Sequence, residues 1–386
     1  MSSMRISFLA PRLPPAVCGV ADHTRLLADE MHGQGAEVAF IHCDAALASG
    51  ASLPGPVNRW TGGSEALESY LAQQQADWLW VQFSNYGYSR WGAPYSLGRD
   101  LRSVRRRMPG VRLAIYLHET HCLPRQLGFK GPILSRWQRH TVAAVTRLGD
   151  LAFVSVAPYE RRVIDEYGVD PSKVFRLPIG SNIPPANLTP EERSRQRRNL
   201  GWADGDVVGV IFGAYPTQVR ALRRFQEVIV RGIRAGILQR VVCVGGDGPV
   251  TPPELLDLVD RFSAPEKFEI LGPRPAEEVG RILNCCDFAF SPTPRHVLEK
   301  SGAFLACAFA GLAVLVYAAP KIEPSDDLPV LPAESWDWRQ ASSTRVTAIR
   351  AALKKRAFSS YTWENIAERA LSYMAAVKLR HALVET

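Results

Sequence analysis

The stretch CDFAFSPTPRHVLEKSGAFLACAFAGLAV, residues 286–314, decides the fold. It predicts a short apolar strand over 288–291, a proline-rich loop, one helix over about 298–310 and then a second apolar strand. Glu299 is therefore expected at a helix start beside the carboxyl end of a strand, where open α/β sheets bind ligands and helix N-termini favour anions. An ordinary strand–helix–strand unit with a charged first helical turn is the alternative interpretation.

The composition is typical of a globular protein with two domains of ordinary size, since the chain has 386 residues, 46% hydrophobic and 22% charged. No window approaches the roughly 20 apolar residues of a membrane-spanning helix, and the N-terminus has no signal-peptide pattern. The seven cysteines are irregularly spaced, which favours reduced thiols, and the pair Cys285 and Cys286 lacks the further ligands of a metal site. We therefore expect a cytoplasmic protein without a bound metal.

A net charge of +8 indicates anionic partners such as phosphates, nucleic acid or an anionic membrane. The arginines form two groups: Arg102, Arg105, Arg106 and Arg107, and Arg193, Arg195, Arg197 and Arg198. No zinc-finger spacing, RNP-type pattern or helix-turn-helix accompanies them, so nucleic acid is not expected as a partner. The first group lies on an expected helix, where a solvated face is the simpler interpretation and a peripheral contact with the inner face of a membrane is the weaker one.

The first half alternates strands and helices from its start. An apolar strand over 5–10 leads through the loop containing Cys18-Gly19-Val20 into a helix that Asp22 is expected to cap. The loop is not a GxGxxG fingerprint, which argues against a dinucleotide cofactor. Further along, a strand over 113–117 ends in His118-Glu119-Thr120-His121, and a functional or a buried structural role for these histidines remains open.

The linker PIGSNIPPANLTPEE, residues 178–192, predicts a domain boundary near 180–188. The second half repeats the alternation, with a helix over about 219–235 that carries Arg220, Arg223 and Arg224 in its first turns. Two Rossmann-like, doubly wound parallel sheets facing a cleft are therefore expected. The expected domains are 1–182 and 183–360, followed by a C-terminal helix over 361–386 that packs back on the first domain.

Several motifs in this order resemble the GT-B retaining glycosyltransferases, in particular the large nucleotide-sugar family often numbered four, also called glycosyl transferases group 1. The matching positions are Cys18-Gly19-Val20, His118, the turn Gly246 to Pro249, Asp287, Pro292-Thr293, Glu299, Gly302, Cys307 to Gly311, and Ala313-Val314. The resemblance spans nearly the whole chain.

The resemblance implies a hexosyltransferase that moves a sugar from a nucleotide diphosphate to a glycan, lipid-linked or small-molecule acceptor, with retention and with neither metal nor cofactor. The acceptor would bind the first domain and the donor the second. Glu299 would hydrogen-bond the donor sugar, His118 would contact the transferred sugar, and Gly19 would bring backbone amides to the diphosphate. The full expected donor-binding set is Gly19, Arg220, Arg224, Gly246, Asp247, Gly248, Pro292, Thr293, Arg295, Gly302 and Cys307.

The chain departs from the family pattern at two places. The second acid, which usually holds the ribose hydroxyls, falls on Cys307, and a thiol is a poor acceptor for two hydroxyls. The arginine and lysine expected after the turn at Gly213 are replaced by Ala214 and a shifted Arg220. A divergent enzyme that uses arginine substitutes is one hypothesis. A non-catalytic scaffold or partner subunit of a glycan-assembly complex is the second, and a sugar-nucleotide epimerase is the third.

Overall fold

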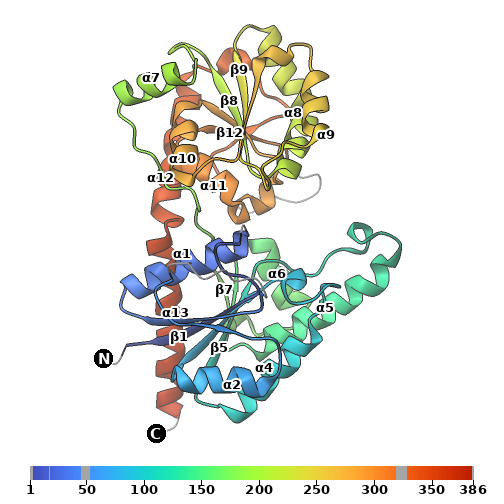
Figure 1. Ribbon diagram of the computed structural model, residues 1–386, viewed down its shortest axis with the longest axis vertical. Helices are drawn as coiled ribbons and strands as arrows, with labels where there is room; N and C mark the ends of the chain where they lie inside the picture. Colours follow the sequence, from blue (N-terminus) through green and yellow to red (C-terminus); the bar gives the residue numbers. More distant parts are fainter. Residues whose placement is uncertain (1–2, 17, 45–52, 319–327, 385–386) are drawn as a thin grey trace. The chain divides into compact units, whose positions relative to one another are not determined.

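The computed structural model divides into two compact units, each built on its own parallel sheet (Figure 1). Unit 1 comprises Met1–Ile179 and Trp363–Thr386, and unit 2 comprises Gly180–Thr362. The structure describes residues 3–16, 18–44, 53–318 and 328–384. Helices cover both faces of each sheet, so the two doubly wound sheets expected from the sequence are confirmed.

Unit 1 contains a seven-stranded sheet, within the part of the chain that the structure describes, in the order β3-β2-β1-β4-β5-β6-β7. Its strands are β1 (Arg5–Ala10), β2 (Glu37–His42), β3 (Val57–Arg59), β4 (Trp78–Phe83), β5 (Arg112–Leu117), β6 (Leu151–Val154) and β7 (Val174–Arg176). All of these pairings are parallel, and the strand order reverses between β1 and β4. At such a switch point the loops at the carboxyl ends diverge and leave room for a ligand.

Two apolar cores cover the faces of this sheet. Successive residues of β4 alternate between them: Trp78 and Trp80 join the core under α1 and α13, while Leu79 and Val81 join the core under α2, α4 and α5. The helices are α1 (Gly19–Gly33), α2 (Ser64–Gln73), α3 (Asn85–Tyr88), α4 (Tyr95–Arg107), α5 (Gly131–Leu148), α6 (Ala157–Asp165) and α13 (Trp363–Val384). The last helix of the chain therefore completes the core of the first unit, as its course beside α1 shows (Figure 1).

Unit 2 repeats the design with the strand order β10-β9-β8-β11-β12-β13. Its strands are β8 (Val208–Phe212), β9 (Arg240–Val244), β10 (Phe268–Gly272), β11 (Phe288–Phe290), β12 (Ala313–Val316) and β13 (Leu331–Pro332). Its α-helices are α7 (Pro190–Asn199), α8 (Tyr215–Arg234), α9 (Pro253–Asp260), α10 (Ala276–Cys285), α11 (Gly302–Phe309) and α12 (Thr344–Ser360). The switch point lies between β8 and β11.

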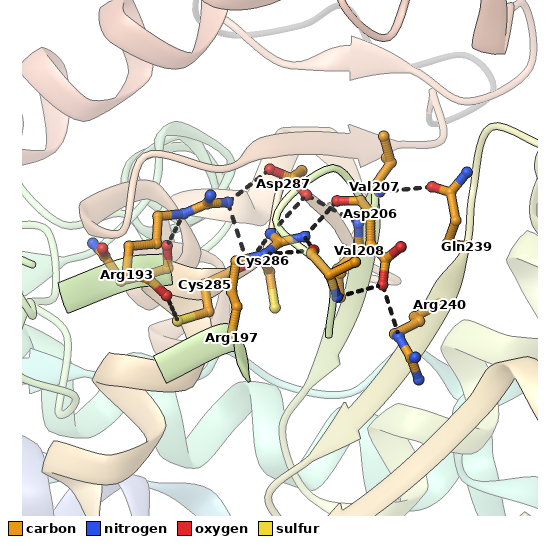
Figure 2. A network of polar contacts seen from close by, with 12 residues as sticks. Arg193, Arg197, Asp206, Val207, Val208, Gln239, Arg240, Cys285, Cys286 and Asp287 are labelled. Carbon is orange, nitrogen blue, oxygen red and sulfur yellow. Dashed lines mark hydrogen bonds and ion pairs between the residues drawn. The ribbon is translucent and has the colours of Figure 1, made fainter. Parts of the chain in front are cut away.

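A buried polar network fastens α7 to the amino ends of β8 and β11 (Figure 2). Arg197, only 1% exposed, donates to the carbonyls of Cys285 (2.8 Å) and Ala203 (2.9 Å) and lies 3.5 Å from the carboxylate of Asp287. Arg193 donates to the same carboxylate at 2.9 Å. Half of the second arginine group therefore holds the fold together, because a buried guanidinium needs partners for its donors.

Three helix starts differ from the sequence-based expectation. The single helix expected over 298–310 is a 3₁₀ helix, Arg295–Lys300, followed by α11, because the hydroxyl of Ser301 accepts from the N–H of Phe304 (3.2 Å) and starts a new helix. Helix α8 begins at Tyr215, with a proline in its first turn, so its arginines lie in the second and third turns. Helix α1 begins at Gly19, and Asp22 lies inside its first turn instead of capping it.

Candidate functional site

Two glycine-rich turns meet at the carboxyl ends of β8 and β9. The buried Gln218 of α8 holds them together, because its amide donates to the carbonyls of Gly213 (2.8 Å) and Gly245 (3.1 Å). A Cβ on Gly246 would lie 2.7 Å from the ring of Tyr215, so only glycine fits there. Sequence reasoning missed Gln218, although a glutamine one turn inside a helix start beside a glycine turn is a recognisable signal.

A hollow of about 620 Å³ opens beside these turns along the first three turns of α8. It is lined by Tyr215, Pro216, Val219, Arg220, Arg223, Arg224, Asp247, Pro252 and Glu254. Both acids of this lining have partners: Asp247 accepts from the N–H of Tyr215 (3.3 Å), and Glu254 pairs with Arg223 (2.8 Å). The volume lies within the range of small-molecule sites, roughly 300–1,000 Å³.

Arg220 and Arg224 line this hollow without forming an ion pair to any residue that the structure describes. Arg220 is exposed. The guanidinium of Arg224 lies 5.1 Å from the ring centroid of Tyr317 and 3.5 Å from the carbonyl of Pro292. Neutral groups therefore orient Arg224 and leave its charge uncompensated, which suits an anionic ligand.

The other residues expected at the donor site lie around the loop after β11 and the start of α11. Arg295 donates to the carbonyl of Leu328 (3.4 Å), and its Nε is buried without a partner among the described residues. Pro292, Thr293 and Cys307 line a void of only about 20 Å³, about the size of one water molecule. Gly248 and Gly302 have open space where a side chain would begin, apart from an Asn182 oxygen 3.8 Å from the position of a Cβ on Gly302.

Cys307 lies in the interior of unit 2, with 4% of its surface exposed. Burial raises the pKa of its thiol to about 12, so the sulfur stays protonated at neutral pH. The position where the resembling family has a second acid is thus held here by a buried, uncharged thiol on α11.

Glu299 lies in the 3₁₀ helix, and its carboxylate is held by the end of α12. Its Oε1 accepts from the hydroxyl of Tyr361 and from Nη2 of Arg356 (3.4 Å). Burial and the neighbouring carboxylate both raise the pKa of Tyr361, so the phenol remains a donor. These partners lie 57 and 62 residues beyond Glu299 in the chain, which no local sequence pattern reveals.

In unit 1, His118 follows β5 and is oriented by a buried amide. Its Nε2 lies 2.7 Å from Oε1 of Gln82 in β4, and Nε2 of Gln82 lies 3.2 Å from Nδ1 of His23 in α1. Since an amide oxygen only accepts and an amide nitrogen only donates, this geometry assigns the protons to Nε2 of both histidines. Burial and the adjacent His118 lower the pKa of His23, which keeps His23 neutral.

The chain segment 361–363 contacts both groups of residues. Tyr361, in unit 2, bonds to Glu299, whereas Trp363, in unit 1, meets the ring of His23 edge-on at 5.2 Å. The ring of His23 lies in turn 4.8 Å from that of His118, at 88°. One residue, Thr362, therefore separates the contact to Glu299 from the contact to His23 along the backbone.

The remaining polar residues after β5 are structural. Glu119 accepts from the hydroxyl of Ser84 and from the N–H of Asn85, both at 2.9 Å, and His121 lies 2.7 Å from the hydroxyl of Tyr167. Gly19 is exposed at the start of α1 with open space around its Cα. Among residues 118–121, His118 alone thus bonds to Gln82 and packs against His23.

Within the described residues, no group of three or more His, Cys, Asp or Glu side chains is arranged to hold a metal ion. The expectation of a metal-free reaction stays a prediction. Among the same residues, no helix combines the length and apolarity that crossing a bilayer requires.

The two sheets, each with the 3-2-1-4-5-6 strand order of a Rossmann-like domain, define the GT-B class of folds. No family model matches the sequence, and no curated protein matches it. Among solved structures, a sucrose-phosphate synthase from Thermosynechococcus elongatus aligns over 99% of this chain and 100% of its own, with 14% identity and a TM-score of 0.69.

Two further solved structures show the same likeness. A glycosyltransferase from Rickettsia africae aligns over 98% of this chain and 99% of its own, with 12% identity and a TM-score of 0.66. HepE from Anabaena, in complex with UDP-glucose, aligns over 97% and 100% of the two chains, with 14% identity and a TM-score of 0.64. At such identities the likeness establishes the fold, and the activity has to be argued from the site.

Proposed function

We propose that this chain is a glycosyltransferase that moves a sugar, most simply a hexosyl group, from a nucleotide diphosphate to a glycan, lipid-linked or small-molecule acceptor. The observation that carries the proposal is the hollow of unit 2, where Arg220 and Arg224 keep an uncompensated charge at the carboxyl edge of the sheet. The UDP, UDP-glucose and ADP bound in solved neighbours support a nucleotide sugar as the donor.

The chemistry of transfer explains the arginines. As the anomeric C–O bond breaks, the sugar becomes oxocarbenium-like and its electron pair moves to the leaving diphosphate oxygen. Positive groups fixed beside that oxygen stabilise the transition state more than the ground state. Arg220 and Arg224, four residues apart on one helix, are suited to this task, and we propose that the reaction retains the anomeric configuration without a metal.

Glu299 and His118 are the proposed catalytic residues. Glu299, held by Tyr361 and Arg356, would accept hydrogen bonds from hydroxyls of the donor sugar, and His118, held by Gln82, would contact the transferred sugar. Gly19 would offer backbone amides at the start of α1. The proposal includes a cytoplasmic location with a peripheral contact to an anionic membrane.

Calorimetric titration with UDP, GDP and ADP tests the donor site. Arg224→Ala is expected to weaken the affinity for the preferred diphosphate about 10- to 100-fold, since a hydrogen bond to a charged group contributes roughly 1.5–3 kcal/mol. Arg223→Ala removes the same charge from the neighbouring position, where Glu254 already neutralises it, and should leave the affinity within about twofold. Absence of binding by all three nucleotides would sink the proposal.

Retention and metal independence are tested by following the formation and the anomeric configuration of the product. Transfer should continue in excess chelator, and the anomeric configuration of the product, read by NMR, should equal that of the donor. Loss of transfer in chelator, restored by a divalent cation, would overturn the metal-free part alone. Product that forms without any acceptor would instead indicate epimerisation.

A non-catalytic partner subunit is the second candidate, and two observations favour it. Cys307 is buried where the family has an acid, and the carboxylate of Glu299 already has protein partners. This candidate predicts stable association with another protein of glycan assembly and no effect of Glu299→Ala on that association.

A further inference from the structure

Large apolar side chains are exposed together at the start of α5. The side chain of Phe129, in the 3₁₀ turn Gly128–Lys130 before the helix, is fully exposed, and Ile133 and Trp137 are 59% and 50% exposed. The three residues are spaced four apart, which keeps them on one side of helical backbone. In Figure 1 this end of α5 reaches out beyond the strands of unit 1.

The loop after α3 extends this surface with a second exposed tryptophan. Trp91 is 55% exposed, and its ring lies 5.9 Å from Nζ of Lys130 and 5.7 Å from the guanidinium of Arg90. The amide of Gln138 donates to the carbonyl of Trp91 at 3.3 Å, which fastens the loop to α5. Trp91, Phe129, Lys130, Ile133, Arg136 and Trp137 are called the aromatic–basic surface below.

The segment that carries most of this surface is basic. Residues 120–149 contain no Asp or Glu, and their basic residues are Arg125, Lys130, Arg136, Arg139 and Arg147. Arg139 and Arg147 are used within unit 1, the former against Glu166 (3.9 Å) and the latter on the carbonyl of Tyr167 (2.6 Å). Lys130 and Arg136 remain exposed beside the apolar side chains.

The arginine group on α4 is a weaker membrane candidate by comparison. Arg105 pairs with Asp150 at 3.0 Å, and Arg107 pairs with Glu68 at 3.4 Å, so half of its charge is compensated. No exposed large apolar side chain belongs to α4 between Arg102 and Arg107 within the described structure. The sequence-based hypothesis placed a membrane contact at this group, and these contacts favour the start of α5 instead.

We propose that the aromatic–basic surface docks unit 1 onto an anionic lipid bilayer. Phe129, Ile133 and Trp137 would enter the boundary between headgroups and acyl chains, where tryptophan is favoured because its ring is apolar and its N–H is polar. Lys130 and Arg136 would lie at the level of the lipid phosphates. An exposed apolar patch whose own segment carries basic and no acidic residues fits an anionic surface better than a mixed protein surface. The proposal does not depend on glycosyl transfer.

Co-sedimentation of the full chain with vesicles tests the proposal. Wild type should bind vesicles of phosphatidylcholine with phosphatidylglycerol and bind phosphatidylcholine alone more weakly. The triple variant Phe129→Ser, Ile133→Ser, Trp137→Ser should lose at least roughly tenfold in partitioning to the anionic vesicles, because it removes the inserted area. These side chains are exposed, so an unchanged thermal unfolding midpoint should accompany the loss.

Two matched double variants test whether the charges that bind the membrane lie on the aromatic–basic surface or on α4. Lys130→Gln with Arg136→Gln and Arg102→Gln with Arg106→Gln each remove two exposed positive charges. The first pair should weaken binding to anionic vesicles several-fold and the second should leave it unchanged within about twofold. Equal losses from both pairs, or a triple variant that binds like wild type, would overturn the proposal. So would a wild type that ignores vesicles and forms a dimer that the triple variant breaks, since a second copy would then be the occupant.

Discussion

The two edges of the sheets use charged residues in opposite ways. At the amino edge, an aspartate precedes a strand, accepts from a backbone N–H of the neighbouring strand and pairs with an arginine or lysine; Asp77, Asp150 and Asp287 all do so. At the carboxyl edge of unit 2, Arg220 and Arg224 have no acidic partner among the described residues. Arginine therefore stabilises the fold at the amino edge, whereas at the carboxyl edge it leaves a positive charge available. The carboxyl edge is the one where open sheets bind ligands.

Arg197→Met tests the amino edge and should have the largest effect. Removing a buried guanidinium takes one donor from each of three carbonyls and one ion-pair partner from the Asp287 carboxylate, which costs roughly 3–5 kcal/mol of unfolding free energy. Urea unfolding measures it. Arg195→Met, an exposed neighbour, should change the unfolding free energy by less than about 0.5 kcal/mol. Equal stability of the two variants would remove the contrast between the edges.

Glu299→Gln tests the carboxyl edge of unit 2. We expect sugar transfer to fall about 10²- to 10³-fold, as for other groups that stabilise developing charge, with little change in nucleotide affinity. Tyr361→Phe removes one donor to the carboxylate and leaves Glu299 in place, so its loss should be smaller, about tenfold. If Glu299→Gln transfers sugar as fast as wild type, Glu299 is a structural residue and the non-catalytic candidate gains support.

Gln82→Leu tests the carboxyl edge of unit 1 with a smaller expected effect. His118 would lose the acceptor that orients it, and turnover should fall roughly tenfold while the Michaelis constant for the donor stays unchanged. Glu119→Gln, next to His118 but bonded to Ser84 and Asn85, is the matched control and should be close to neutral. A rise in the Michaelis constant alone would indicate that Gln82 supports binding rather than the reacting geometry.

The smallest effect expected is on the acid stability of unit 1. Burial lowers the folded-state pKa of His23 below 6.5, so the unfolded chain takes up the proton first as the pH falls. The folding stability that is linked to a neutral His23 is therefore fully present above about pH 6.5. It is lost as the pH falls from there toward the folded-state pKa of His23. His23→Gln should therefore narrow the gap between urea midpoints measured at about pH 7.5 and about pH 5.5. His42 and His121, whose pKa values burial also lowers, should keep part of the gap.

The sequence predicts the sheets well because a buried parallel strand leaves a local pattern. The predicted helix starts were wrong where apolar periodicity was given more weight than a start signal. Two such signals are visible in the sequence: Ser301 before Gly302, and Pro216 in the first turn of α8. Gln82 is also visible as the one polar residue in the apolar run 78–83. The contact of Glu299 with Arg356 and Tyr361 is not, because no local pattern encodes a partner some 60 residues away.

The segment 361–363 has a consequence for how such chains can be recombined. Tyr361 contacts Glu299 within unit 2, and Trp363 contacts His23 within unit 1. A chimera that exchanges the whole of unit 2 with a crossover at Thr362 would therefore keep each contact between residues of one parent. A crossover inside the first turn of α13 would instead pair Trp363 of one parent with residue 23 of the other, and we expect it to weaken the core of unit 1.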